Sequence, residues 1–306
     1  MQIYIPNPVA FILNTLENNG YCAYVVGGCV RDSLLGKTPT DWDIATNATP
    51  EEVQDLFEHT IPTGTKYGTV TVRIEQQSFE VTTFRKDGSY LGNRKPERVF
   101  FTDRIHEDLA RRDFTINAMA YHEKKGLLDL FGGRRDLEKR LIRSVGNPEE
   151  RFEEDALRML RGVRFAAQLE FDVDPDTAHA ILKKNFLLQN VSSERIREEF
   201  NKILLARKPS LGIQKMIDFG LLPYILPKPA DATGVEFDAF KSVQKDSEYL
   251  LAVIDAVQPD IPLRVAAFLN GLIKKNQFFS SGDFSEEGRL CRDAVDAAEA
   301  AEKILR

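Results

Sequence analysis

A glycine pair followed by an aspartate pair constrains the N-terminal part of this sequence more than any other feature. The apolar residues 24–26 predict a short strand, Gly27 and Gly28 break it, and the segment VRDSLLG at 30–36 predicts a helix. Paired glycines at such a turn let backbone N–H groups approach a phosphate, which the helix N-terminus also favours. Arg31 adds a planar guanidinium suited to phosphate oxygens. This segment therefore predicts a phosphate-binding turn.

The sequence DWDIA at 41–45 predicts a second strand, on which Asp41 and Asp43 share one face. Neighbouring carboxylates repel each other unless a cation lies between them, and Mg²⁺ is the usual hard cation for oxygen ligands. Glu80, on a neighbouring predicted strand, is a candidate third acid of a two-metal site for in-line displacement at phosphorus. A glycine pair or an Asp-x-Asp alone is usually a turn or a solvated strand end. Their combination predicts catalytic acids.

A second polar cluster is the sequence RRDFTIN at 111–117. Arg111 and Arg112 are candidates for holding a triphosphate, while Asp113 accepts a ribose hydroxyl and Asn117 lies beside them. The alternative is a structural ion pair at the end of a loop. The sequence does not decide between the two interpretations.

A third cluster lies in EEDALRMLRGVRF, where helical periodicity extends over 150–169. Asp155 and Arg158, as i and i+3 neighbours, are expected to pair and brace each other. Arg158, Arg161 and Arg164 then form a slanted stripe on that helix. A rigid Asp–Arg pair offers donors and acceptors in fixed positions, as recognition of a base edge requires. The alternative is a solvated ion-pair ladder.

The pattern of the whole chain predicts an α+β head of about 140 residues with an all-helical remainder. Thr49 to Glu52 form a predicted capping box with proline at the first helical position. The polar segment 85–99 is expected to be a mobile loop. Further helices are expected to begin at Asp174-Pro175 and Ser192-Ser193, and another to stop at Gly220.

Composition adds few constraints to this picture. The net charge of −6 does not favour nucleic acid, but residues 85–164 carry 19 Lys and Arg against 15 Asp and Glu, so a local basic groove is compatible with it. There is no apolar run of membrane-spanning length, and the first residues do not look like a secretory leader. Three cysteines without metal-like spacing suit a reducing cytoplasm, which is the expected location.

Five motifs in order resemble the class II tRNA nucleotidyltransferases, relatives of bacterial poly(A) polymerase in the polymerase-β-like superfamily. These motifs are GGCVRDSLLGKTPTDWDIAT, LARRDFTINAMA, LLDLFGGRRDLEKRLIRSVG, EEDALRMLRGVRF and SSERIREEFNKIL, and the resemblance covers about residues 20–225. It implies a nucleotidyltransferase head with a mixed sheet at 1–140 and a helical neck that recognises the nucleotide at 141–225. It also implies a helical body or partial tail at 226–306.

The resemblance also implies roles for individual residues. Asp41 and Asp43 would bind Mg²⁺, and Gly28, Arg31 and Arg112 would contact the triphosphate of CTP or ATP. Asp113 would contact the ribose. Asp155 and Arg158 would pair with the base edge of CTP and then ATP, with Arg161 and Arg164 nearby. The expected substrate is the tRNA 3′ end, and oligomeric state is not predicted.

Specificity within the family is less constrained. The form P-T-G-x-K-x-G-T-V at 62–70 resembles the tRNA enzymes rather than poly(A) polymerases, although Tyr67 replaces a more usual histidine. The pattern of Tyr90, Arg94, Pro96 and Val99 resembles the loop that permits a switch to ATP. It favours CCA addition over CC addition, with an A-adding enzyme, a poly(A) polymerase and a catalytically silent RNA-binding protein as alternatives.

The tail departs from the family pattern. Residues 261–271 resemble the start of an HD phosphohydrolase-like helix, but Asn270-Gly271 stands in place of the His-Asp pair, so a metal site is not expected there. The sequence stops at Arg306 within a helical pattern, which favours a shortened tail, natural or artificial, and reduced affinity for tRNA.

Overall fold

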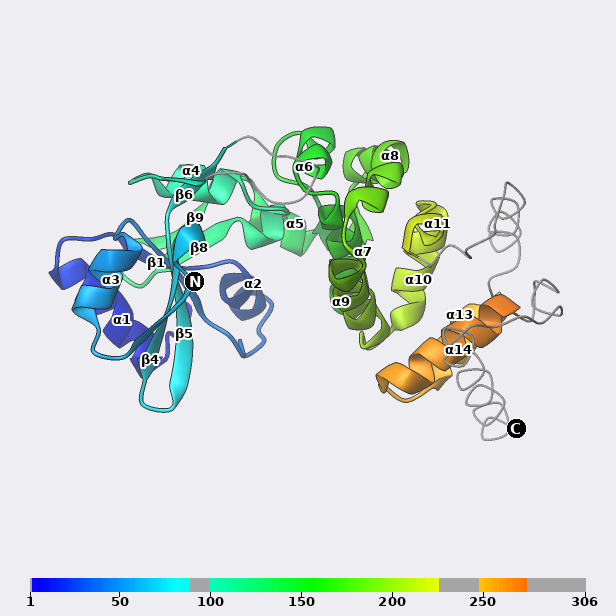
Figure 1. Ribbon diagram of the computed structural model, residues 1–306, viewed down its shortest axis with the longest axis horizontal. Helices are drawn as coiled ribbons and strands as arrows, with labels where there is room; N and C mark the ends of the chain where they lie inside the picture. Colours follow the sequence, from blue (N-terminus) through cyan, green and yellow to red (C-terminus); the bar gives the residue numbers. More distant parts are fainter. Residues whose placement is uncertain (1, 89–98, 226–247, 274–306) are drawn as a thin grey trace. The chain divides into compact units, whose positions relative to one another are not determined.

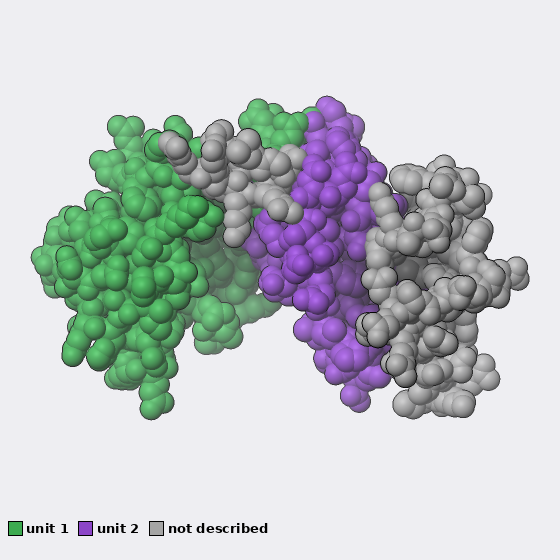
Figure 2. Space-filling model, in the orientation of Figure 1, with its two compact units in different colours: residues 1–155 green, residues 156–306 purple. Residues whose placement is uncertain are grey.

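The computed structural model describes residues 2–88, 99–225 and 248–273. The chain divides into two compact units, residues 1–155 and residues 156–306 (Figure 2). Three segments discussed above lie outside the described residues: the middle of the predicted loop with Tyr90, Arg94 and Pro96, the third cysteine Cys291, and the C-terminal residues 298–306.

The first unit contains the following elements in chain order (Figure 1): α1 (Asn7–Asn18), β1 (Ala23–Val26), α2 (Gly28–Leu34), β2 (Asp43–Thr46), α3 (Pro50–Leu56), β3 (Thr60–Gly64), the 3-10 turn η1 (Thr65–Tyr67), β4 (Thr69–Ile74), β5 (Gln77–Thr83), β6 (Arg85–Asp87), β7 (Val99–Phe101), α4 (Ile105–Ala110), the 3-10 turn η2 (Thr115–Asn117), β8 (Met119–His122), β9 (Gly126–Asp129), α5 (Gly133–Glu138), β10 (Leu141–Ile142) and α6 (Pro148–Glu154).

Seven of these strands form one mixed sheet in the order β3-β4-β5-β2-β1-β8-β9. The pair β2 and β5 is parallel, and the other neighbours are antiparallel. In the parallel pair Asp43 lies opposite Glu80, so the sheet itself brings two of the predicted catalytic acids together. The expected mixed sheet is confirmed.

A capping box at Thr49 starts helix α3, and a core cluster holds strands β1 and β2. Thr49 accepts a hydrogen bond from the backbone N–H of Glu52 at 3.3 Å, and the Glu52 carboxylate accepts one from the Thr49 backbone N–H at 2.7 Å. This reciprocal pair is the predicted capping box of α3, with Pro50 at the first helical position. One core cluster beneath the sheet joins Val26 of β1 and Ala45 of β2 to Phe84, Leu109 and Ala120 from later segments. It fixes β1 and β2, the strands that flank the glycine pair and the acids.

Two expectations about strands are corrected. The second strand begins at Asp43 and not at Asp41, because β1 pairs only as far as Val26 with Asp43. The segment 85–99 is not loop throughout, because Arg85–Asp87 and Val99–Phe101 pair as the antiparallel strands β6 and β7. Its polar composition hid this pairing, which is made with residues more than ten positions away.

A third expectation, continuous helix from 150 to 169, is also wrong. Helix α6 ends at Glu154, and Asp155 has φ −143° and ψ 102°, an extended conformation, before α7 (Leu157–Leu169) begins. Asp155 and Arg158 are therefore not neighbours on one helix, and the i, i+3 geometry expected for them does not apply.

The second unit contains, after α7, the elements β11 (Asp172–Val173), α8 (Pro175–Lys184), the 3-10 segment η3 (Asn185–Asn190), α9 (Ser193–Leu204), α10 (Pro209–Asp218), α11 (Leu222–Ile225), α13 (Glu248–Ala256) and α14 (Ile261–Ile273) (Figure 1). Apart from the two-residue β11, its described residues form no strand, which agrees with the expected helical remainder. The predicted helix starts at Asp174 and Ser192 are confirmed, and α10 stops before Gly220, whose φ is +62°. Gly212 lets helix α10 approach α9 and α7 closely, since a Cβ at this position would lie 2.5 Å from Ile203 of α9 and 3.1 Å from Ala167 of α7.

Candidate functional site

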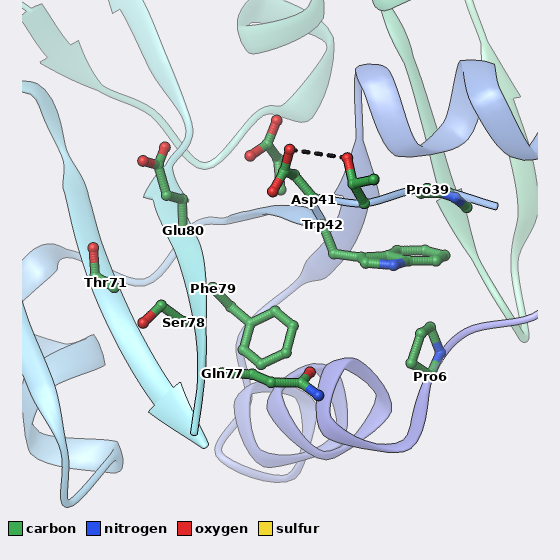
Figure 3. A pocket seen from close by; sticks show the side chains of 11 residues that line it. Pro6, Pro39, Asp41, Trp42, Thr71, Gln77, Ser78, Phe79 and Glu80 are labelled. Carbon is green, nitrogen blue, oxygen red and sulfur yellow. Dashed lines mark hydrogen bonds between the residues drawn. The ribbon is translucent and has the colours of Figure 1, made fainter. Parts of the chain in front are cut away.

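The three predicted acids line one pocket of about 890 Å³ in the first unit (Figure 3). The segment from Pro39 to Asp43 forms one wall, and residues 77–80 of β5 form another. In Figure 3 the carboxylates of Asp41 and Glu80 point to the same side of the pocket, whereas the indole of Trp42 points toward Pro6. Asp41 accepts a hydrogen bond from the hydroxyl of Thr40 at 3.1 Å. Asp41 and Asp43 thus share the pocket, with the buried Trp42 between them in the sequence.

The electrostatics of Asp43 reflect this crowding of carboxylates. Desolvation by the surrounding protein raises the pKa of Asp43, Arg112 partly offsets this, and Glu80 and Asp41 raise it further. Burial, together with Asp43, also raises the pKa of the neighbouring Cys29 thiol to about 12, so this cysteine remains a thiol at neutral pH. The repulsion between the Asp41 and Asp43 carboxylates therefore destabilises their ionised forms, and a bound cation would offset it.

The chemistry of these donors fits a hard divalent cation. Among the described residues no group of three or more His, Cys, Asp or Glu side chains is arranged to hold a metal ion. The role of Glu80 as a third acid stays a prediction. Mg²⁺ is commonly bound by one or two carboxylates, with waters and substrate phosphate oxygens as its remaining ligands. The pair Asp41 and Asp43 matches that requirement.

The predicted phosphate-binding residues come together around Asn117. Arg31 donates to the side-chain oxygen of Asn117 at 2.8 Å, and the Asn117 amide nitrogen donates to Asp113 at 3.3 Å. Arg31 also forms two hydrogen bonds to Asp32, at 2.8 and 2.9 Å. Asp113 accepts a further bond from the backbone N–H of Phe114 at 2.8 Å. Asn117, which is buried, thus holds Arg31 and Asp113 in one network.

Arg112 lies against the glycine turn. Gly27 has φ +75°, and a Cβ at this position would lie 2.9 Å from Nη1 of Arg112. The same nitrogen donates to the backbone oxygen of Asn117 at 3.4 Å, and Arg112 acts electrostatically on Asp43. The structure therefore places Arg112 against the glycine turn and near Asp43, although Arg112 is far from both in the sequence.

Arg111 behaves differently from its neighbour. Its Nε and Nη2 both donate to Oδ1 of Asp108, at 3.0 and 2.7 Å. These two bonds to one carboxylate oxygen form a structural ion pair, the alternative that the sequence left open. Arg112 makes one bond to the other oxygen of Asp108, from Nη2 at 3.2 Å.

The predicted base-recognition residues lie after α6 and on α7. Asp155 lies in the extended link after α6, and Arg158 is buried in α7 of the second unit. Arg164 is also buried, pairs with Glu199 of α9 at 3.2 Å, and has its guanidinium 4.2 Å from the ring centroid of Phe165. Arg161 reaches the same Glu199 at 3.9 Å. Two arginines of the predicted stripe are therefore anchored on one buried acid.

Sequence reasoning missed two buried acids, Asp108 and Glu199. Asp108 stands three and four positions before the arginine pair, a spacing that was available as a signal on a helix. Glu199 is 35 positions from Arg164, so sequence spacing gave no signal for that pair.

Asp43→Asn should make the folded chain more stable in metal-free buffer. Because the folded-state pKa of Asp43 is raised, its ionised form destabilises the fold, most strongly at neutral pH and above, and less so as the pH falls through that pKa. After allowance for solvent screening, we expect the Tm to rise by about 1–2 °C. Thermal unfolding at neutral pH checks this, and millimolar Mg²⁺ should raise the Tm of the unsubstituted chain but not of the variant. A lower Tm for Asp43→Asn in EDTA would contradict the assigned repulsion.

The sheet order and the paired acids of β2 and β5 define a polymerase-β-like nucleotidyltransferase head. In agreement, residues 23–143 match the family described as Poly A polymerase head domain. Residues 170–233 match the family described as Probable RNA and SrmB-binding site of polymerase A.

Relatives extend the likeness over almost the whole chain. The CCA-adding enzyme of Bacillus subtilis is 40% identical over 301 residues, which cover 96% of this chain and 75% of that protein. The Bacillus stearothermophilus CCA-adding enzyme, solved in complex with CTP, is 34% identical with a TM-score of 0.76, and the match covers 99% of this chain and 72% of that one. The chain belongs to the family of CCA-adding enzymes.

Coverage of other relatives is smaller. The CCA-adding enzyme of Ligilactobacillus salivarius is 45% identical over 240 residues, which cover 78% of this chain but 58% of that protein. The match to the CCA-adding enzyme of Limosilactobacillus reuteri covers 54% of that protein. The chain thus matches little more than half the length of these relatives. Among the described helices, none has the length and apolarity needed to span a bilayer.

Proposed function

We propose that this chain is a template-independent nucleotidyltransferase that adds CCA to the 3′ end of tRNA, using CTP and ATP and releasing pyrophosphate. The observation that carries the proposal is that Asp41, Asp43 and Glu80 line one pocket. Arg112, which lies against Gly27, also acts electrostatically on Asp43. Membership of the CCA-adding family supports the choice of tRNA as substrate. We also propose that the chain works in the cytoplasm, which its three cysteines without metal-like spacing suit.

The acids and the arginines would divide the work of the reaction. Asp41 and Asp43 would hold Mg²⁺, which when bound lowers the pKa of the attacking 3′ hydroxyl and neutralises charge on the departing pyrophosphate. The turn at Gly27 and Gly28 would admit the triphosphate close to the backbone, and Arg112 would donate to its oxygens. Asp113, held by Asn117, would accept a ribose hydroxyl.

Base recognition would belong to the segment that follows the head. We assign recognition of the base to Asp155 and Arg158, with Arg161 and Arg164 supporting this base site. Arg31 and Arg111 would support the separate triphosphate site. Support comes from the family resemblance of this segment and from the anchoring of Arg161 and Arg164 on Glu199. On this basis we propose a head at 1–140, a neck at 141–225 and a body at 226–306.

Incubation with labelled CTP or ATP, separately, on tRNA lacking CCA and on tRNA ending in CC tests the proposal. CCA addition predicts C incorporation on the first substrate and A incorporation on the second. Incorporation of A alone, only on tRNA ending in CC, would identify an A-adding enzyme. Long A tracts on any RNA would identify a poly(A) polymerase. Binding of tRNA without any incorporation would favour a catalytically silent RNA-binding protein.

A further inference from the structure

A buried acid stands behind the arginine pair of the first unit. Asp108, on α4, is 1% exposed, and its carboxylate accepts hydrogen bonds only from arginine residues among the contacts described. Oδ1 accepts hydrogen bonds from Nε and Nη2 of Arg111, and Oδ2 accepts one from Nη2 of Arg112 at 3.2 Å. The backbone N–H of Arg85, at the start of β6, completes the set at 3.4 Å. A carboxylate this deeply buried is stable only because these donors surround it.

The two arginines use Asp108 in different ways. Arg111 commits two nitrogens to Oδ1, so its guanidinium is turned toward the acid. Arg112 commits one proton of Nη2 to Asp108 and one of Nη1 to the Asn117 backbone oxygen, and each terminal nitrogen carries a second proton. Those second protons are suited to phosphate oxygens, and Nη1 lies beside the glycine turn.

The charges of the cluster point to an anionic ligand. Burial alone would raise the pKa of Asp108, but the attraction and hydrogen bonds of Arg111 and Arg112 outweigh it and hold this pKa below its ordinary value. Asp108 is therefore ionised at neutral pH. Asp108, Arg111 and Arg112 by themselves sum to one net positive charge, and Arg112 lies beside Gly27. Arg112 also acts on the Asp43 carboxylate, whose charge a bound cation would offset.

We propose that Asp108 is a positioning residue that fixes the guanidinium of Arg112 for the triphosphate of the incoming nucleotide. Arg111 is the second anchor of that acid and balances its charge. The inference rests on the proposed function, because it takes Arg112 as a triphosphate contact. It adds that affinity for CTP and for ATP depends equally on a buried residue that touches neither nucleotide.

Asp108→Asn tests this assignment, because the amide keeps the size of the side chain and removes its charge. We expect the KM for CTP and for ATP each to rise about tenfold, since hydrogen bonds to charged groups contribute on that scale. The KM for tRNA and the ratio of C to A incorporation should stay within about twofold. In an Arg112→Ala background the same substitution should cause no further rise, because the group that Asp108 positions is already absent.

Outcomes that overturn the proposal are an unchanged nucleotide KM in Asp108→Asn, or an equal further rise in the Arg112→Ala background. If Asp108→Asn does not fold, Asp108→Glu keeps the charge and should bind CTP within about threefold of the unsubstituted chain at a lower Tm; loss of CTP binding by a folded Asp108→Glu would contradict the proposal. Equilibrium binding of CTP without tRNA separates this inference from the proposed function. A chain that binds CTP but transfers nothing contradicts the function, while weaker CTP binding by Asp108→Asn would still support the positioning role.

Discussion

Asp41→Asn and Asp43→Asn are each expected to lower nucleotide incorporation by about a thousandfold or more. Both carboxylates line the pocket, and the two act on each other electrostatically, which is the arrangement that a shared divalent cation requires. Loss of a metal ligand removes several kcal/mol of transition-state stabilisation, and each 1.36 kcal/mol corresponds to about a tenfold change in rate. Single-turnover incorporation of CTP into tRNA lacking CCA measures the effect.

Glu58→Gln is a matched control for these two substitutions. It also converts an acid of the first unit to its amide, but Glu58 is exposed and does not line the pocket. We expect its incorporation rate to stay within about twofold of the unsubstituted chain, as for most surface changes. If folded Asp43→Asn retained more than about a tenth of the activity, the assignment of this acid as a metal ligand would be wrong.

Arg158→Ala is expected to reduce discrimination between CTP and UTP by about 10- to 100-fold. An arginine that reads a base edge contributes about 1–3 kcal/mol of discrimination, and alanine removes every donor. Arg158 is buried in α7, which limits the positions its guanidinium can adopt. The ratio of kcat/KM values for the four nucleoside triphosphates measures the change.

Arg207→Ala serves as the control for that experiment. It removes an arginine of the same unit whose side chain is 90% exposed and whose acid partner, Glu170, lies 3.9 Å away. Such surface pairs contribute little, so neither the Tm nor the discrimination should change measurably. If a folded Arg158→Ala variant discriminated between CTP and UTP as well as the unsubstituted chain, residues other than Arg158 would have to recognise the base.

Features of the head that depend on residues close together in the sequence could be predicted. The capping box at Thr49, the strand-to-helix turn at Gly27 and the helix start at Asp174 depend on residues within a few positions of each other. All three appear as predicted. The strand that carries Asp43 was also expected, but its first residue depends on pairing with β1 and lies two positions later.

Non-local partners account for what was missed. The polar residues of β6 form a strand only because Val99–Phe101 pairs with them. The contact of Arg31 with Asn117 joins residues 86 positions apart, and sequence spacing cannot reveal it. Asp155 leaves the helix that periodicity predicted, because periodicity reports which faces are apolar and not where a helix is interrupted.

Asp43 at the start of β2 and Asp41 just before it are proposed to form a magnesium site for CCA addition to tRNA. The most direct measurement supplies tRNA lacking CCA with CTP, ATP and Mg²⁺, and determines the length and sequence of the extended 3′ end. We expect addition of C, C and A with no further extension, and no addition by the Asp41→Asn, Asp43→Asn double variant or in EDTA. Extension that persists in EDTA or in the double variant, or a product other than CCA, would contradict it.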